Sequence, residues 1–301
     1  MKLLSFLVAV VVSAAGCVPS VFLPTGSMVT PEPFVTPAPT MTPTATPEIT
    51  PTAEFATPVR AYLMLTLADG TTGLVPVRRD LFMLMDPPAA ETMRALLDGP
   101  DAVERASDPA PFTQIPVGTR LVTLDMSGPV ANVELSREFL GGSPKAVLER
   151  MAQVVYTLTQ FPTVTSVAIS VERVAVTAPF TGGALKRPLK RTDFSEQLPA
   201  IFVDTPAWGD LTTSPVTVRG YANVFEAQFT AQIRDSAGTV LSAKTVTASC
   251  GTGCRGTFLT TLPYSVAIDQ WGTLRVYSAS AKDGAPENER IYPIRLRPQT
   301  P

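Results

Sequence analysis

The clearest hydrophobic pattern in the chain predicts a helix that leads directly into a strand over residues 143–171. Ser143 can cap this helix, Pro144 suits its first position, and Pro162 stops it. Apolar residues at three- and four-residue spacing give the helix one buried face. These residues are Leu148, Met151, Val155 and Leu158. The strand that follows places Val167, Ile169 and Val171 on one face, alternating with Ser166, Ala168 and Ser170.

Polar residues interrupt the predicted helix. They are Gln153, Thr157, Thr159 and Gln160. Such residues cap a helix, bond to nearby backbone or face water, and this is what we expect here. A role in holding a ligand is the alternative.

The preceding residues predict the rest of an α+β unit. Strands are expected over 59–67 and 74–79, followed by a helix that begins near Asp86 and ends at Gly99. Two more strands come next, and their expected inward residues are Val122, Leu124 and Met126 in one and Ala131, Val133 and Leu135 in the other. The order strand, strand, helix, strand, strand, helix, strand indicates an α+β sandwich with the helices on one face of a sheet.

From Ile201 onward the pattern changes to short strands separated by turns. The clearest strand has one apolar face made of Phe225, Ala227, Phe229, Ala231 and Ile233. About seven strands at this spacing predict an all-β, immunoglobulin-like sandwich. Its aromatic residues are expected to pack in the core or at the rim, and a glycan-binding face is the alternative. They are Trp208, Trp271, Tyr264 and Tyr277.

Several blocks in the first half resemble, in order, the GerMN domain of sporulation and spore-germination proteins. They are LVPVRR at 74–79, LLDGP at 96–100, Glu104, IPVGTRL at 115–121, VELSREF at 133–139 and AQVVYTLTQFPTVTSVAISV at 152–171. In the second half, three blocks resemble the immunoglobulin-like domain of bacterial spore germination. They are SPVTVRGYANVFEA at 214–227, the turn at 235–238 and VYSASAKDG at 276–284. These resemblances imply a sporulation or envelope-assembly process, and they supply no catalytic residues.

The first seventeen residues have the composition of a bacterial export signal. A single Lys2 precedes an apolar run, and Ala14-Ala15-Gly16-Cys17 resembles a lipobox, which implies a lipid on Cys17 and a place on the outer side of the cell membrane. An ordinary cleaved signal peptide or an uncleaved anchor is the alternative. Residues 18–58 contain ten Pro and ten Thr and predict a disordered tether.

The expected domain organisation follows. It is a lipoprotein signal peptide at 1–17, the tether at 18–58, a GerMN-like domain at 59–173, a linker at 174–200 and an immunoglobulin-like domain at 201–298. The linker carries four basic residues that we expect in solvent. They are Lys186, Arg187, Lys190 and Arg191. Because this segment is rich in Gly, Pro and charge, we expect few contacts across it and independent folding of the two domains.

The amino-acid composition excludes several kinds of catalytic, metal-binding and nucleic-acid-binding site. The chain has no histidine, which excludes the histidine-based catalytic triads and imidazole metal ligands. A net charge of −2 offers no basic surface for nucleic acid. Gly251, Gly253 and Gly256 match a dinucleotide fingerprint, but a strand rather than a helix is expected after them. Cys250 and Cys254 are expected to form a disulfide at a hairpin tip, with a free or redox-active pair as the alternative.

We therefore expect a non-enzymatic accessory or scaffold protein of the bacterial envelope, without metal or cofactor. Its expected partners are envelope proteins or the cell wall, and the N-terminal lipid provides its contact with the membrane. A binding module for cell-wall glycan or a small ligand is the alternative. A hydrolase that uses two carboxylates is a third hypothesis, for which no pair of Asp or Glu residues stands out.

Overall fold

The computed structural model describes residues 57–81, 88–126, 128–177 and 187–299. These residues belong to one compact unit of the chain. The expected signal peptide, Cys17 and nearly all of the expected tether lie outside the described residues. Among the residues that are described, no helix is long and apolar enough to cross a membrane.

The first domain follows the order of elements that the sequence predicts. Its elements are β1 (Thr57–Thr66), β2 (Thr72–Leu81), α1 (Pro88–Asp98), α2 (Ala102–Arg105), β3 (Leu121–Asp125), β4 (Val130–Leu135), the 3-10 turn η2 (Arg137–Leu140), α3 (Pro144–Leu158), β5 (Ser166–Val171) and β6 (Val174–Ala175). The antiparallel pair β1–β2 forms one sheet, and a second sheet has the order β3-β4-β5-β6. The α+β class is confirmed.

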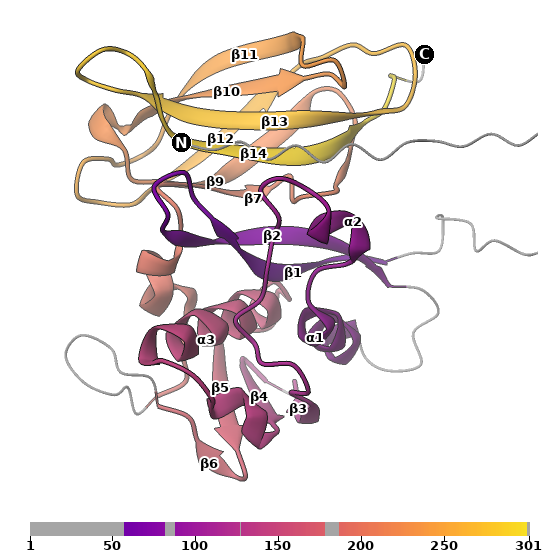
Figure 1. The fold of residues 1–301 in the computed structure, drawn as a ribbon, viewed down its shortest axis with the longest axis vertical. Coiled ribbons are helices and arrows are strands. Elements are labelled where there is room, and N and C mark those ends of the chain that lie inside the picture. The colour runs from indigo at the N-terminus through magenta and orange to yellow at the C-terminus, as the bar shows by residue number, and fades with distance from the viewer. Residues whose placement is uncertain (1–56, 82–87, 127, 178–186, 300–301) are drawn as a thin grey trace, which may run out of the picture. The chain divides into compact units, whose positions relative to one another are not determined.

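The two long helices lie between the two sheets (Figure 1). The sequence pattern predicts strands against one side of the helices, and the structure has strands on both sides. The reason lies in α3, where every residue from Glu149 to Leu158 is buried. A helix that is buried all round needs a packing partner on each side. The β1–β2 ribbon supplies the second partner.

Helix α3 begins and ends as its sequence predicts. The Ser143 hydroxyl accepts a hydrogen bond from the Ala146 amide at 3.2 Å, and Pro144 occupies the first turn. Met151, Val155 and Leu158 are buried in the core, and Leu148 is partly buried against it. The apolar face of this helix is thus confirmed.

Polar residues of α3 and of the turn that follows it bond to the free edge of β1, which the sequence does not predict. The Gln160 side chain accepts from the Arg60 amide at 2.8 Å and donates to the Arg60 carbonyl at 2.7 Å. Thr157 accepts from the Tyr62 amide at 3.1 Å, and Gln153 donates to the Tyr62 carbonyl at 3.0 Å. The side chains of these three residues replace the missing neighbouring strand of β1.

The expectation of local bonding or exposure to water is therefore wrong for Gln153 and Thr157. Local bonding is confirmed for Thr159, which donates to the Val155 carbonyl at 2.6 Å. Gln160 also donates to the Thr157 carbonyl at 2.7 Å.

Strand β3 departs from the predicted alternation. Its register with β4 shifts between Leu121 and Thr123, which marks an irregularity of the β-bulge type. Val122, expected in the core, is consequently 55 % exposed. Leu124 and Met126 are partly buried against the core, and the inward residues predicted for the returning strand are buried.

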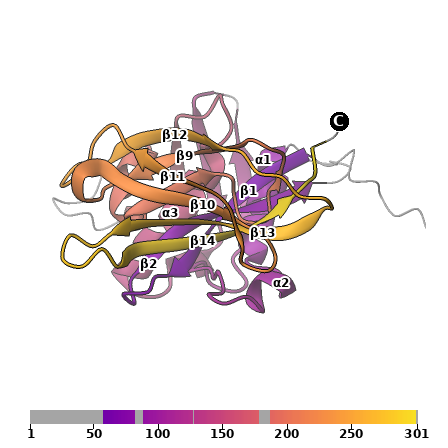
Figure 2. The ribbon, with the colours of Figure 1, turned by 90° about the horizontal axis from the view of Figure 1, so that it is seen from above.

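The second domain is a β-sandwich, as predicted. Its elements are the 3-10 turn η3 (Arg191–Gln197), β7 (Ile201–Thr205), β8 (Leu211–Thr212), β9 (Val216–Ala222), the 3-10 turn η4 (Phe225–Ala227), β10 (Gln228–Arg234), β11 (Val240–Thr247), β12 (Gly256–Leu262), β13 (Gln270–Ala279) and β14 (Pro286–Leu296). One sheet has the order β11-β10-β13-β14-β8 and the other β12-β9-β7. Figure 2 shows strands β9 to β14 of this domain from above.

The clearest predicted strand begins later than expected. Glu226 and Ala227 have positive φ values of 56° and 57°, so the backbone turns there and β10 starts at Gln228. Phe225 is 59 % exposed as a result, against the expectation that it faces the core. The remaining apolar residues of the strand are buried; they are Phe229, Ala231 and Ile233.

The end of the expected linker is folded and packed. Leu189 exchanges backbone hydrogen bonds with Val167 at 2.7 and 2.8 Å. These bonds attach the chain at Leu189 to the edge of β5. The turn η3 then contacts α3 and β2, and Phe194 is fully buried there. The buried apolar residues of the two domains form one continuous cluster. The expectation of few contacts across this segment is therefore wrong.

Candidate functional site: the polar junction of the two domains

Aromatic side chains from both domains meet where the two domains join. Tyr62 of β1 and Tyr156 of α3 have ring centroids 5.4 Å apart, and the Tyr156 ring meets Phe202 of β7 edge-on at 6.0 Å. Phe202 in turn stacks on Tyr221 of β9 at 6.4 Å. The row runs from the inside of the first domain to the sandwich, and such pairs contribute beyond the apolar area that they bury.

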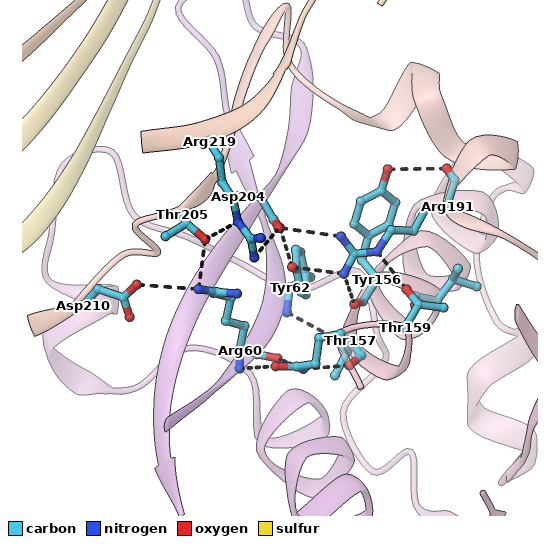
Figure 3. Close-up of polar contacts among 12 residues, drawn as sticks. Arg60, Tyr62, Tyr156, Thr157, Thr159, Arg191, Asp204, Thr205, Asp210 and Arg219 are labelled. Carbon is cyan, nitrogen blue, oxygen red and sulfur yellow. Dashed lines mark hydrogen bonds and ion pairs between the residues drawn. The ribbon is translucent and has the colours of Figure 1, made fainter. Parts of the chain in front are cut away.

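Arg191 of η3 is inserted into this row (Figure 3). Its guanidinium carbon lies 5.2 Å from the centre of the Tyr62 ring and 4.6 Å from that of Tyr156. Its Nε donates to the Thr159 hydroxyl at 2.8 Å and its Nη2 to the Tyr156 carbonyl at 3.0 Å. Arg191 was expected in solvent as part of a linker, yet its side chain is only 23 % exposed. Cation–π contact and hydrogen bonds to α3 explain the difference.

Asp204 is the acceptor at the centre of the junction. The pairing of β7 with β9 skips from Val203 to Thr205, so Asp204 is the extra residue of a bulge, which redirects its side chain. Gly220 permits this close pairing, because a Cβ there would lie 1.9 Å from the Phe202 carbonyl oxygen. Asp204 accepts a hydrogen bond from the Tyr62 hydroxyl at 2.5 Å. Arg191 and Arg219 approach the same carboxylate at 3.6 and 3.8 Å.

A second set of contacts joins the domains beside Asp204. Arg60 of β1 donates to the Thr205 hydroxyl at 3.1 Å and lies 3.9 Å from the carboxylate of Asp210. Arg78 of β2 approaches the same carboxylate at 3.9 Å. Burial raises the pKa of Asp210, while the two arginines and a hydrogen bond from the Ala207 amide act in the opposite direction. Two arginines of the first domain therefore face one carboxylate of the second.

The backbone adds a third connection through Trp208. Its amide donates to the Pro76 carbonyl at 2.9 Å, and its carbonyl accepts from the Arg78 amide at 2.8 Å. These bonds form a parallel bridge between Trp208 and Val77, so the outer edge of β2 is partly paired with the second domain. Both edges of the β1–β2 ribbon are thus engaged, one by α3 and one by the sandwich.

The electrostatics of the junction suit a structural role, holding the two domains together, better than a catalytic one. Burial, followed by the negative charge of Asp204, raises the pKa of Tyr62, so this hydroxyl stays protonated and donates. Burial likewise raises the pKa of Tyr156. A protonated phenol beside a carboxylate that two arginines accompany is a poor nucleophile. Among the described residues, no group of three or more acidic or cysteine side chains could hold a metal ion.

The structure separates the other predicted site residues from this junction. Cys250 and Cys254 are joined by a disulfide, with Cα atoms 5.8 Å apart, in the connection between β11 and β12. Strand β12 starts at Gly256, so the glycine-rich motif leads into a strand and lacks the helix that a dinucleotide site needs. Cys17 lies outside the described residues.

Two of the four sandwich aromatics are buried and two lie on a sheet face. Trp208 and Tyr264 are buried. Trp271 is 46 % exposed, with the Arg295 guanidinium 5.3 Å from the centre of its ring. Tyr277 shares the same face of β13 and has Arg275 over its ring at 4.3 Å. Core or rim packing describes the first pair, and an aromatic face with arginines over it describes the second.

The sequence does not predict that these residues meet at the junction, because they are far apart in the chain and none belongs to a recognisable sequence motif. One signal was available in the segment taken as a linker. Leu189, Phe194 and Leu198 are large apolar residues there, and all three are buried. Their presence indicates a packed segment rather than a solvated one.

Two family models match the chain. One is described as "Sporulation and spore germination" and covers residues 62–176, and the other as "Immunoglobulin-like domain of bacterial spore germination" and covers residues 200–285. The chain contains both germination domains. The resemblances drawn from the sequence blocks are thereby confirmed. The junction joins the GerMN-like domain to the immunoglobulin-like domain, since Tyr62 and Tyr156 belong to the first and Asp204 to the second.

Several solved structures match the chain at low identity and with low TM-scores. The tandem GerMN domains of the sporulation protein GerM from Bacillus subtilis are 15 % identical, over 80 % of this chain and 61 % of that one, with a TM-score of 0.37. The first GerMN domain of the same protein is 20 % identical, over 44 % of this chain and 98 % of that one, with a TM-score of 0.34. A protein provisionally titled a lipoprotein, from Clostridium perfringens, is 18 % identical, over 46 % and 89 %, with a TM-score of 0.29. No curated protein matches the chain.

Proposed function

We propose that this protein is a lipid-anchored, extracytoplasmic accessory protein without enzymatic activity, of the kind associated with sporulation and spore germination. It holds two joined domains that bind envelope proteins or the cell wall. The observation that carries the proposal is the junction. Tyr62, Arg191 and Asp204 fix two germination-type domains as one body, which suits a scaffold whose binding surfaces must keep a set relation.

The anchor is tested at Cys17. Replacing Cys17 with Ala should leave the N-terminus unprocessed by the lipoprotein route, because the thiol is the atom that carries the lipid. Mass spectrometry of the N-terminal peptide measures this, and the Cys250→Ala/Cys254→Ala double variant is the matched control that should keep its lipid. A wild-type N-terminus that is unmodified, or that lies elsewhere than Cys17, would remove the anchor from the proposal.

The partners are tested by cross-linking the full chain in its native cell, followed by mass spectrometry. We expect the same envelope proteins or cell-wall fragments to be recovered repeatedly, and the yield to fall in a variant whose junction is weakened, Asp204→Asn. That variant must remain anchored and present at the wild-type level for the comparison to count. Recovery of no envelope neighbour with the wild-type chain would contradict an accessory role.

A glycan- or small-ligand-binding module is the second candidate, favoured by the exposed Trp271. Aromatic faces suit sugar rings, but Arg295 covers one face of this indole. We therefore rank this function second. Saturable binding of the full chain to purified peptidoglycan, lost in Trp271→Ala and kept in Phe225→Ala, would reverse the order. Release of reducing ends from the wall, lost on substitution of an Asp or Glu, would instead support a hydrolase.

A further inference from the structure

Arg290 of β14 is a charged residue in a register that the strand otherwise fills with apolar side chains. Burial alternates along β14, and Arg290 points the same way as Tyr292, Ile294 and Leu296, which are buried. Arg290 itself is only 4 % exposed. Arginine is almost never this buried without a partner. Its position therefore calls for a group that compensates its charge.

Among the described residues, none supplies a hydrogen-bond acceptor to two donor atoms of Arg290. The Nε and Nη2 atoms of Arg290 are buried and have no hydrogen-bond partner there. A buried donor without an acceptor destabilises the fold, and it does so more strongly when the donor is charged. The nearby Glu289 carboxylate is already taken by Arg275. A guanidinium whose donors lack acceptors pairs favourably with an anion beside it.

Two adjoining cavities have Arg290 in their walls. One, of about 330 Å³, is bounded by the β1–β2 turn, by Pro199 and by the start of β14. The other, of about 550 Å³, lies between the same turn, residues 108–110 and β14. Both also include Leu67, Ala68 and Glu289. Their sizes fall within the roughly 300–1,000 Å³ of pockets for small molecules.

Carboxylates surround the buried guanidinium. Asp69 in the β1–β2 turn, Asp108 and Glu287 line these cavities, and all three are exposed residues. The pKa of Asp69 is lowered chiefly by hydrogen bonds from Thr71, with a smaller contribution from Arg290. Because these cavities have three carboxylates and one buried cation in their walls, a ligand with several negative charges would be repelled. The same arrangement favours a ligand that pairs one carboxylate with one ammonium group.

We propose that the two adjoining cavities form a binding site for a free α-amino acid. The ligand carboxylate pairs with the positive charge of Arg290, and its ammonium group faces the carboxylates of Asp69, Asp108 and Glu287. The apolar carbons of Leu67 and Ala68 are available to its side chain. The site is formed by both domains, so it exists only while the junction holds them together. This goes beyond the proposed accessory role, and either can fail without the other.

Isothermal titration calorimetry of the full chain tests the proposal. Glycine, D-alanine and each of the common L-amino acids are titrated in turn, with acetate, methylammonium and inorganic phosphate as probes that carry only part of the charge pattern. We expect at least one amino acid to bind saturably at one site, and each partial probe to bind at least ten-fold more weakly. The absence of saturable binding by every amino acid would overturn the proposal, as would phosphate or acetate binding as tightly.

Variants locate the site. Arg290→Gln should weaken amino-acid binding at least ten-fold, and unchanged binding would overturn the assignment. Because a buried substitution can unfold the chain, a second variant changes only exposed residues: Asp69→Asn combined with Glu287→Gln. It should keep the wild-type circular dichroism, weaken amino-acid binding and strengthen acetate binding, each at least three-fold. If the preference for amino acid over acetate stays as in the wild type, the proposed role of the Asp69 and Glu287 carboxylates is wrong. Asp235→Asn, at a distant turn, is the matched control.

Discussion

Asp204 is the residue on which the junction most depends, because three groups from different elements converge on it. Tyr62 donates to it at 2.5 Å, and Arg191 and Arg219 place positive charge within 3.6 and 3.8 Å. Its side chain is 14 % exposed, so water screens these contacts weakly. Losing one partner of such a group leaves the others buried without compensation.

Asp204→Asn should therefore lower the free energy of unfolding by about 3 kcal/mol. Asparagine still accepts from Tyr62, but it removes the charge that compensates Arg191. Urea unfolding followed by circular dichroism measures the change. The matched control is Asp269→Asn, which breaks an exposed pair with Arg295 and should cost less than about 1 kcal/mol. Equal losses in the two variants would show that the junction carries no special weight.

The buried tyrosines make stability depend on alkaline pH. Burial raises the pKa of Tyr62 above its ordinary value of 10.0, so the folded chain keeps this proton when the unfolded chain has lost it. The stabilisation that protonated Tyr62 contributes is complete below pH 10, and it is lost as the pH rises toward the raised pKa of its hydroxyl. Between pH 9 and pH 11 the urea midpoint of the wild type should fall more steeply than that of Tyr62→Phe. Parallel curves for the two proteins would contradict this assignment.

At the scale of elements, α3 combines two roles that a single hydrophobic pattern cannot describe. Its apolar face packs in the core, while Gln153 and Thr157 on another face, with Gln160 just beyond its end, satisfy the backbone of β1. Residues of β1 and α3 joined this way are about a hundred positions apart, with separations of 91 to 100. The sequence predicts the helix and its boundaries well because caps and spacing are local. The partner of its polar face is not local, and no periodicity points to it.

Thr157→Val tests this role of α3 with almost no change in shape. The substitution leaves the buried Tyr62 amide without its acceptor, so it should lower the free energy of unfolding by about 1–3 kcal/mol. Thr123→Val, on an exposed position of β3, is the matched control and should change stability by less than about 0.5 kcal/mol. Chemical denaturation of both variants gives the comparison. A loss in Thr157→Val no larger than in the control would mean that water replaces the lost acceptor.

At the scale of the whole molecule, the sequence predicts the two fold classes and their order but misses their union. Each domain has its own periodic pattern, which is why both were predictable. The junction depends on a bulge at Asp204, on one arginine between two tyrosines and on a Trp208 bridge, and each of these arises only when distant segments meet. Composition alone made residues 174–200 resemble a linker.

We expect the full chain to unfold in one transition, against the independent folding that the sequence suggested. The apolar residues at the boundary form one continuous core, and separating the domains would expose Tyr62, Phe202 and Trp208. Differential scanning calorimetry of the full chain tests this, together with fragments 59–175 and 200–301. The fragments should each melt well below the full chain. Two transitions of the full chain, each matching one fragment, would restore the two-unit view.

The bonding of β1 also has a consequence in time. During synthesis β1 and β2 emerge first, and the side chains of α3 and Gln160 that satisfy the edge of β1 follow roughly a hundred residues later. Asp204 and Trp208, which engage the ribbon from the second domain, emerge later still. Until then the ribbon has two open edges, and strands with open edges pair with whatever strand is near. A chain cut short anywhere between β2 and α3 should therefore aggregate rather than persist as a soluble fragment.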